Sequence, residues 1–312
     1  MNILITGAYG FVGTNLSNTL KEKKYTLWAL DISYKDTTSY SKSFSWNDLE
    51  KLPWNEIDII IHLAGKAHDL KNKSGSKEYF DVNTVLTQKI YDWFLKSQAK
   101  KFIFFSSVKA VADIVENDIL TEDVVPKPVG PYGESKIAAE NYILHNLNPE
   151  KIVYILRPCM IHGPGNKGNL NLLYNLVHKG IPYPLGLYEN KRSFTSIDNL
   201  SFIVASLVER DIPFGIYNIS DDEALSTNEL VEIIAGSSNK PKRIWKIPKI
   251  VVRFFSSLGT LFHLPFNNDR LQKLTENYIV SNEKIKNVIG IKKMPLSSKD
   301  GFKETIKSLK NE

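Results

Sequence analysis

Two residues with complementary chemistry, Tyr132 and Lys136, lie four positions apart in the segment GPYGESKIAAE (130–140). On a helix, residues at positions i and i+4 face the same side. A free tyrosine has a pKa of about 10 and is a poor base at neutral pH, but a neighbouring ammonium favours its ionised form. The pair can therefore move a proton or simply belong to a solvated helix surface, and only the rest of the chain can decide between the two.

A second candidate site is the segment ITGAYGFVG (5–13), which places Gly7, Gly10 and Gly13 between a predicted strand and a predicted helix. The alternative is an ordinary glycine-rich turn, since the spacing is not the common Gly-x-Gly-x-x-Gly. Glycines here let the backbone approach a pyrophosphate, which the helix N-terminus attracts. Asp31 ends the next predicted strand, where an acid binds both hydroxyls of an adenosine ribose and repels a 2′-phosphate. The pattern predicts a dinucleotide site that favours NAD(H), with NADP(H) as the alternative.

Short apolar strands alternate with helices over the first half of the chain. The predicted strands are 2–6, 26–31, 57–65, 101–107 and 151–158, and the predicted helices are 11–24, a long helix from Tyr79 past Trp93, and one beginning near Tyr132. This order predicts an α/β fold with a Rossmann-type, doubly wound parallel sheet covered on both faces. Ligands bind such sheets beyond the carboxyl ends of the strands.

After Pro158 the regular alternation of strands and helices gives way to loops rich in Gly, Asn and Pro. A strand and helix at 193–209 and a strand at 215–220 look like returns to the sheet, and Ser226 with Glu229 predicts a capped helix start. We therefore expect an NAD-binding domain over residues 1–160 and 195–222. A smaller, interrupted α/β substrate-binding region is expected over 161–194 and 223–312.

Composition narrows the class of protein. The 312 residues are 42% hydrophobic and 24% charged, as in globular proteins, and Cys159 is the single cysteine, so no intrachain disulfide can form. The N-terminus lacks the basic start of a signal peptide and no uninterrupted apolar run approaches a membrane span, so we expect a cytoplasmic protein. The sequence leaves open whether it forms a homodimer.

The net charge of +6 raises the question of nucleic acid, but the basic clusters are short and scattered and no nucleic-acid-binding motif is present. A basic balance equally suits small anions such as dinucleotides and sugar diphosphates. The six histidines show no metal-ligand spacing, so we expect no metal site.

Several motifs, taken in order, give the chain a resemblance to the extended short-chain dehydrogenase/reductase family, which includes nucleotide-sugar epimerases, dehydratases and reductases. The resemblance runs from Met1 to about Phe302. It rests on TGAYGFVG (6–13), HLAGKAH (62–68), Asn83 in DVNTVLTQ, FFSSVKAV (104–111), YGESK (132–136), LRPCMIHGPG (156–165) and RSFTSIDNL (192–200). Independent motifs in one order are far more specific than any single motif.

The resemblance implies roles for individual residues. Tyr132 is the acid/base, Lys136 holds the nicotinamide ribose and lowers the phenol pKa, and Ser107 hydrogen-bonds the sugar oxygen on the carbon that changes oxidation state. Ser106 is expected against the cofactor. The implied cofactor contacts are Gly7, Gly10, Phe11, Val12, Gly13, Asp31, Leu63, Ala64, Gly65, Asn83, Ser106, Tyr132, Lys136 and Pro158.

The resemblance also implies a UDP-sugar substrate. Besides Ser107, Asn169 matches a nucleotide-sugar contact and Arg192 a diphosphate-binding arginine, for which guanidinium suits a diphosphate through paired hydrogen bonds. Arg270 is either a second such arginine or a surface charge. The family's 4,6-dehydratases carry an Asp-Glu pair after the serine, but Val108–Lys109 follows here, so we expect no dehydration.

The segments SSVK, GPGNKGNL, PYPLG and NKRSF resemble one bacterial branch of capsule and O-antigen enzymes. It contains 4-keto reductases of UDP-linked 2-acetamido-2,6-dideoxyhexoses and UDP-hexose(amine) 4-epimerases. We expect reduction of UDP-2-acetamido-2,6-dideoxy-hexos-4-ulose, with 4-epimerisation of UDP-glucose or UDP-N-acetylglucosamine as the alternative. A non-catalytic dinucleotide-binding regulator has no need of the phenol, so the intact Ser107–Tyr132–Lys136 set disfavours it.

The segment RIWKIPKIVVRFFSSLGTLF (243–262) is basic, aromatic and partly amphipathic. Such a segment can lie on a membrane surface. We favour the other interpretation, a helix of the substrate-binding region, because the family has an apolar helix at this point.

Overall fold

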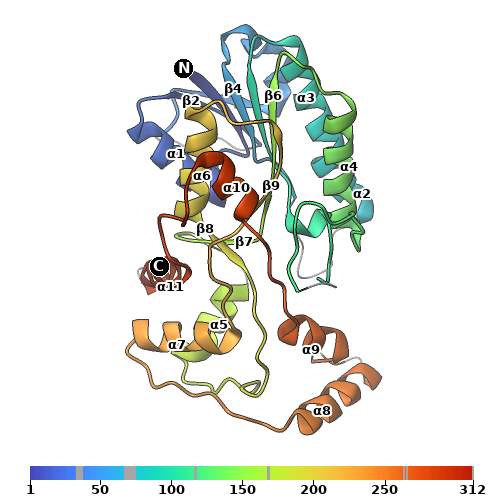
Figure 1. The fold of residues 1–312 in the computed structure, drawn as a ribbon, viewed down its shortest axis with the longest axis vertical. Coiled ribbons are helices and arrows are strands. Elements are labelled where there is room, and N and C mark those ends of the chain that lie inside the picture. Colours follow the sequence, from blue (N-terminus) through green and yellow to red (C-terminus); the bar gives the residue numbers. More distant parts are fainter. Residues whose placement is uncertain are drawn as a thin grey trace.

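The computed structural model describes residues 1–32, 38–66, 75–115, 118–166, 169–262, 264 and 266–310, and only the backbone of Asn169. Seven parallel strands form the central sheet in the order β3-β2-β1-β4-β5-β6-β9 (Figure 1). They are β1 (Asn2–Thr6), β2 (Thr26–Asp31), β3 (Lys42–Ser45), β4 (Ile59–His62), β5 (Lys101–Phe105), β6 (Ile152–Pro158) and β9 (Gly215–Ile219). The strand order reverses between β1 and β4, which confirms the doubly wound fold and places the ligand crevice at that point.

Helices cover both faces of the sheet because its strands are apolar on both sides. Ile3 and Ile5 of β1 pack in one core with α1 and α6, whereas Leu4 packs in a second core with α3 and α4. The helices on the first face are α1 (Phe11–Glu22), α6 (Ile197–Glu209) and α10 (Glu283–Ile289), and those on the second are α3 (Leu86–Lys96) and α4 (Pro131–His145).

The long helix expected from Tyr79 onwards is not uniform. It begins as α2 (Ser76–Phe80), widens into a π-helical turn over Asp81–Val85 and continues as α3. Short 3₁₀ turns cover Trp46–Lys51, Trp54–Glu56 and Val108–Ala110. The π-helical turn matters for the site because it carries Asn83.

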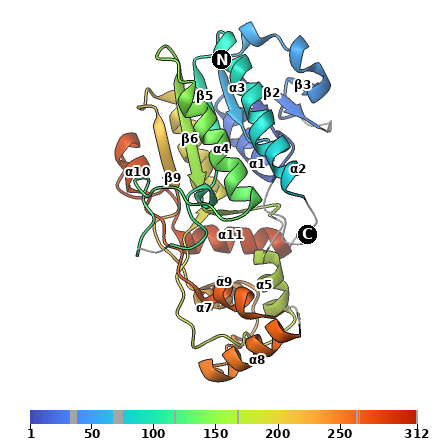
Figure 2. The same ribbon diagram turned by 90° about the vertical axis from the view of Figure 1, so that its right-hand side faces the viewer.

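A second lobe lies beyond the carboxyl ends of the strands (Figures 1 and 2). It contains α5 (Asn169–His178), α7 (Thr227–Ser237), α8 (Lys249–Leu261), α9 (Asn268–Thr275) and α11 (Ser298–Lys310). The predicted capping box of Ser226 and Glu229 starts α7. A parallel pair, β7 (Met160–His162) and β8 (Phe194–Ser196), is the second sheet.

Our proposed domain boundaries need one refinement. Ile285 and Ile289 of α10 belong to the core beneath α6, and α10 packs against β9. We therefore propose that α10 belongs to the NAD-binding domain, although it follows residue 223. Within the described residues, we find no helix whose length and apolar character would let it cross a bilayer.

The ring of His62 makes the sheet core sensitive to acid. Its Nδ1 lies 2.7 Å from Thr6 Oγ1 and its Nε2 lies 2.9 Å from Thr87 Oγ1. Burial, helped by the charge of Lys136, lowers the pKa of His62 from 6.5 to about 3. An unfolded histidine binds its proton near pH 6.5, so this contribution to stability is complete above that pH and is lost as the pH falls towards 3.

We predict that the free energy of unfolding falls as the pH drops from 7 to about 4.5, with His62 contributing up to about 1.4 kcal/mol per pH unit. In His62→Gln this slope should be shallower, because no proton can bind there. Urea unfolding of both proteins across the range measures the difference. Parallel slopes would show that His62 does not carry the effect.

Candidate active site

The turn between β1 and α1 is built to let a ligand approach its backbone. Gly7 has a φ of +67°, and a Cβ on it would lie 2.8 Å from the amide nitrogen of Ala64. A Cβ on Gly13 would lie 2.5 Å from the carbonyl oxygen of Ala8. Gly10 caps α1 without a side-chain hydrogen bond, and the first turn, which contains Phe11 and Val12, has no acidic residue. The positive end of the helix is therefore available to a pyrophosphate, as NAD requires.

The carboxylate of Asp31 is fixed beside this turn. Its Oδ2 accepts a hydrogen bond of 2.9 Å from the amide of Tyr9, and its Oδ1 accepts one of 2.7 Å from the amide of Ile32. The acid thus ends β2 at the rim of the glycine turn, where the ribose of a dinucleotide is held in this fold.

The segment after β4 forms the opposite wall. Leu63, Ala64 and Gly65 follow the strand directly, and the Ala64 amide donates to Thr6 Oγ1 at 3.1 Å. A Cβ on Gly65 would lie 3.0 Å from both Asn83 Oδ1 and Lys136 Nζ. The structure therefore brings together three predicted cofactor contacts that are far apart in the sequence.

Asn83 locks this wall in place from the π-helical turn. Its Oδ1 accepts from the amide of Lys66 at 2.7 Å, and its Nδ2 donates to Ser135 Oγ at 3.0 Å. The side chain is completely buried. π-helical turns are frequent at functional sites. Here the turn carries Asn83, whose side chain links the segment after β4 to α4.

Two of the three predicted catalytic side chains, Ser107 and Tyr132, meet at the start of α4. Ser107 follows β5 and caps the 3₁₀ turn, accepting from the amide of Lys109 at 3.2 Å. A Cβ on Gly133 would lie 2.4 Å from the carbonyl oxygen of Lys109, so only glycine lets α4 pack this closely. That approach places Tyr132 against Ser107 and within its hydrogen-bonding range.

Burial changes the pKa values of both Tyr132 and Lys136. Burial raises the pKa of Tyr132, and the hydrogen bond with Ser107 lowers it in part. Lys136 Nζ donates to the carbonyl of Phe105 at 2.8 Å, and burial lowers the pKa of this lysine to about 8. Lys136 is therefore mainly charged at neutral pH. Its predicted effect on the phenol, once a cofactor is bound, stays a prediction.

Two features of this wall escaped the sequence analysis. Tyr79 lies edge-on to Tyr132, with 6.3 Å between ring centroids. Ser106 donates to a carboxylate oxygen of Glu140, which forms a buried ion pair with Arg157 at 2.5 Å. The predicted contact of Ser106 with the cofactor stays a prediction, as does that of Pro158, which ends β6.

Among the predicted substrate residues, Arg192 has a side chain held by several contacts. Its guanidinium lies 3.3 Å from Glu276 Oε1 and donates to the carbonyl of Lys273, at the end of α9. Glu276 has no motif around it that would have predicted this contact. Arg270 is exposed on the same helix, one turn before Lys273. The side chain of Asn169 lies outside the described residues.

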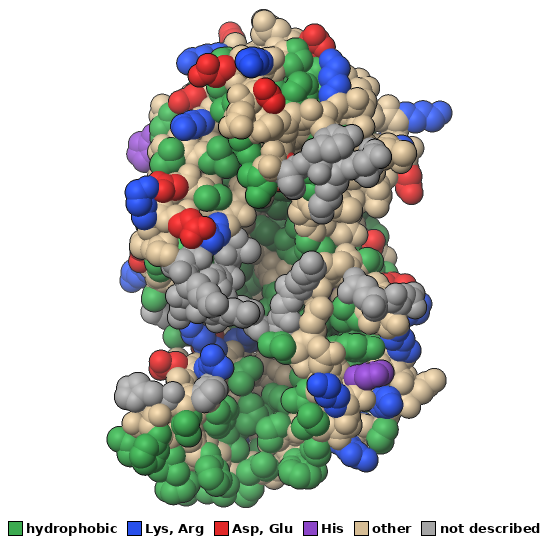
Figure 3. All heavy atoms as spheres, turned by 180° about the vertical axis from the view of Figure 1, so that it is seen from behind, with side chains coloured by type: hydrophobic (Ala, Val, Ile, Leu, Met, Phe, Trp, Pro, Cys, Tyr) green, Lys and Arg blue, Asp and Glu red, His purple; other side chains and the backbone are tan. Residues whose placement is uncertain are grey.

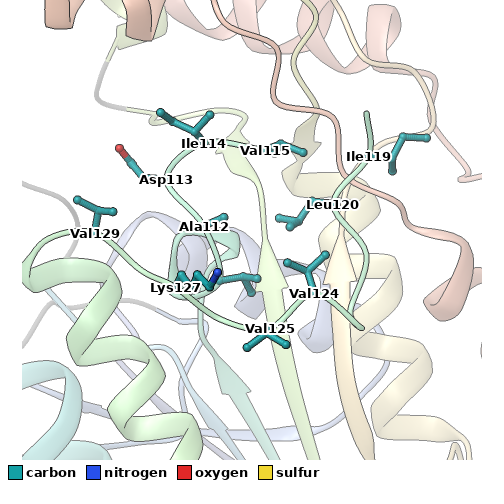
Figure 4. Close-up of a pocket in the computed structure, with 11 residues that line it drawn as sticks. Ala112, Asp113, Ile114, Val115, Ile119, Leu120, Val124, Val125, Lys127 and Val129 are labelled. Atoms are coloured by element: carbon teal, nitrogen blue, oxygen red, sulfur yellow. The ribbon is translucent and has the colours of Figure 1, made fainter. Parts of the chain in front are cut away.

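A pocket of about 400 Å³ lies in the loop between Ser107 and Tyr132, but it is not the catalytic centre (Figure 4). Its lining is mostly Val, Ile and Leu side chains, and Asp113 and Lys127 are its charged members. Ser107, Tyr132 and Lys136 are not among the lining residues. We find no group of three His, Cys, Asp or Glu side chains suited to a metal ion in the part of the chain that the structure describes.

Comparison with known proteins agrees with this geometry. Residues 3–220 match the NAD dependent epimerase/dehydratase family. The chain is 31% identical over 316 residues to the UDP-glucose 4-epimerase of Vibrio cholerae, covering 97% of this chain and 94% of the relative. It is 30% identical over 294 residues to the N-acetyl-alpha-D-glucosaminyl-diphospho-ditrans,octacis-undecaprenol 4-epimerase of Escherichia coli O157:H7, covering 91% and 84%. The UDP-N-acetylglucosamine 4-epimerase from Bacillus cereus shares the fold, with a TM-score of 0.79 at 21% identity over 99% of both chains.

We predict that the protein binds NADH more tightly than NADPH and that Asp31→Ala narrows the difference. The carboxylate accepts from ribose hydroxyls and repels a 2′-phosphate. Calorimetry with both cofactors measures the ratio, and Asp58→Ala, an exposed acid at the opposite end of the sheet, is the control. Tighter binding of NADPH by the unmodified protein would contradict the role of Asp31.

Proposed function

The chain belongs to the NAD dependent epimerase/dehydratase family, and we propose that it transfers hydride at C4 of a diphosphate-linked hexose or aminohexose. The observation that supports this proposal is the hydrogen bond between Tyr132 and Ser107, on the helix whose Lys136 lies at the wall beside the glycine turn. A dinucleotide-binding regulator would need the turn but not the phenol.

In the proposed reaction, NAD supplies the acceptor or donor of the hydride at C4. The phenolate of Tyr132 takes the proton of the C4 hydroxyl when the sugar is oxidised, and the phenol returns it when the ketone is reduced. Ser107 Oγ donates to the same sugar oxygen and holds it within reach of the phenol. Lys136 orients the nicotinamide ribose and, through its positive charge, favours the phenolate.

We propose 4-epimerisation of a UDP-linked hexose or N-acetylhexosamine as the net reaction. The two relatives above that share at least 30% identity over more than 90% of this chain are both 4-epimerases by name. An epimerase removes hydride from C4 and returns it to the opposite face, so the cofactor ends each cycle as it began.

Reduction of UDP-2-acetamido-2,6-dideoxy-hexos-4-ulose is the second candidate. The segments SSVK and GPGNKGNL favour it, because they resemble the branch that contains such reductases. A relative named dTDP-4-dehydro-6-deoxyglucose reductase, from Escherichia coli, is 25% identical over 76% of this chain. The same three catalytic side chains serve either reaction.

The carrier of the sugar is a further choice. The Escherichia coli O157:H7 relative acts, by its name, on a sugar joined through a diphosphate to undecaprenol. A guanidinium such as that of Arg192 recognises a diphosphate whether a nucleoside or a lipid follows it. We propose UDP as the carrier and include the lipid-linked sugar in the test.

Incubation with four substrates separates these reactions. UDP-glucose, UDP-N-acetylglucosamine and undecaprenyl-diphosphate-linked N-acetylglucosamine are each supplied with NAD, and UDP-4-keto-6-deoxy-N-acetylhexosamine with NADH or NADPH. Interconversion at C4 without net change in nicotinamide absorbance, seen by NMR of the products, would support epimerisation. Stoichiometric oxidation of the reduced cofactor by the keto sugar alone would support the reductase instead.

We predict that Tyr132→Phe lowers turnover by on the order of 100- to 10,000-fold while leaving nucleotide-sugar binding largely intact, because it removes only a proton-transfer group. Tyr142→Phe is the matched control, since Tyr142 lies near the other end of the same helix, where its hydroxyl donates to Asp92. Turnover close to that of the unmodified protein in Tyr132→Phe would refute the assignment.

A further inference from the structure

The outer end of the second lobe exposes a cluster of large apolar side chains, which we name the apolar tip. It lies where α8 and the segment after it form the end of the molecule, and Figure 3 shows apolar side chains gathered there. The exposed fractions of Ile250, Phe254 and Leu261 are 79%, 61% and 68%. The apolar tip consists of Trp245, Ile250, Phe254, Phe255, Leu261, Phe262, Leu264 and Phe266.

The inner face of α8 is too closely packed against its neighbours to take large side chains, so these side chains lie on the outer face. The residues that α8 buries are Val252, Ser256 and Gly259. Ser256 Oγ lies 2.6 Å from Asn268 Oδ1, and a Cβ on Gly259 would lie only 1.7 Å from the carbonyl oxygen of Phe266. Small and polar groups therefore join α8 to α9, and the bulky side chains face out. This is the reverse of the usual arrangement for a surface helix.

Basic residues precede α8 and enter its first turns, on one flank of the apolar tip. Residues 240–253 contain six basic side chains, and no acidic residue occurs from 233 to 268. Lys242 pairs with Glu232. Lys240, Lys246, Lys249 and Arg253 form no ion pair with any residue that the structure describes, although Lys249 Nζ lies 5.3 Å from the ring centroid of Tyr188, so no acidic side chain offsets their charges.

We propose that the apolar tip and its basic flank bind the surface of an anionic lipid bilayer. Aromatic and aliphatic side chains enter the boundary between headgroups and acyl chains, and lysine and arginine meet the lipid phosphates. α8 has 13 residues and would lie in the interface rather than cross it.

The charge also argues against a second copy of the chain as the occupant. A two-fold dimer places the same surface on both subunits against itself. Joining two apolar tips in that way would bring both basic flanks together, with no acidic residue from 233 to 268 to offset them. An anionic bilayer satisfies the apolar and the basic groups at once.

Flotation of the full chain with lipid vesicles tests the proposal. Vesicles of phosphatidylcholine alone and of phosphatidylcholine with about 30% phosphatidylglycerol are the two probes. We expect the protein to float with the anionic vesicles, more weakly with the neutral ones, and less as salt is raised. The double variants Phe254→Ser with Phe255→Ser, and Lys246→Glu with Arg253→Glu, should each weaken binding to anionic vesicles about tenfold or more.

Phe214→Ser is the matched control, because Phe214 is 62% exposed just before β9, at the opposite end of the sheet from the second lobe. It should float like the unmodified protein. Melting temperature and NAD binding show that each variant is folded, and neither readout depends on turnover. Equal flotation of the double variants and the unmodified protein would overturn the proposal. So would failure to bind anionic vesicles, or a dimer in light scattering that the Phe254 and Phe255 substitutions abolish.

Discussion

The site is organised around one interaction, the hydrogen bond from the buried ammonium of Lys136 to the backbone carbonyl of Phe105. A charge in a protein interior is costly unless it is hydrogen-bonded, and here the carbonyl of Phe105, at the end of β5, accepts from it at 2.8 Å. That bond ties α4 to the sheet edge where ligands bind. Burial and, to a smaller extent, the same charge lower the pKa of His62, so its ring beneath the site is neutral at neutral pH.

The surrounding backbone is shaped to leave room for this lysine. Gly65 has no side chain because Lys136 Nζ and Asn83 Oδ1 both lie 3.0 Å from where a Cβ would be. Gly133 lets α4 approach the 3₁₀ turn after Ser107. The π-helical turn directs Asn83 between the end of β4 and Ser135. The end of β5 and the segment after β4 thus contact this lysine, and Tyr132 lies one turn before it on the same helix.

Much of this arrangement was predictable because most of the site residues come directly after a strand in the sequence. Runs such as NILIT and KFIFF are buried on both faces, and the glycines and serines that follow them fall at one edge of a parallel sheet. β3 was missed because KSFS is short and polar and is a strand only by pairing with β2. Glu140 and Arg157 were missed because single charged residues in a helix and a strand normally face water, and only the fold brings them together. The π-helical turn left no trace in the periodicity of residues 79–93.

In the segment 243–262, the spacing of apolar residues does not predict which face of the helix is buried. Its apolar residues recur at helical spacing, which normally marks the face that a helix buries. The buried face is instead set by the start of α9 and the segment before it. Asn268 and the close carbonyl of Phe266 contact the side of α8 that carries Ser256 and Gly259. α9 also supplies the carbonyl and carboxylate that hold Arg192 at its other end. The short helix α9 and its flanking residues therefore contact both the arginine proposed for the diphosphate and the inner face of α8.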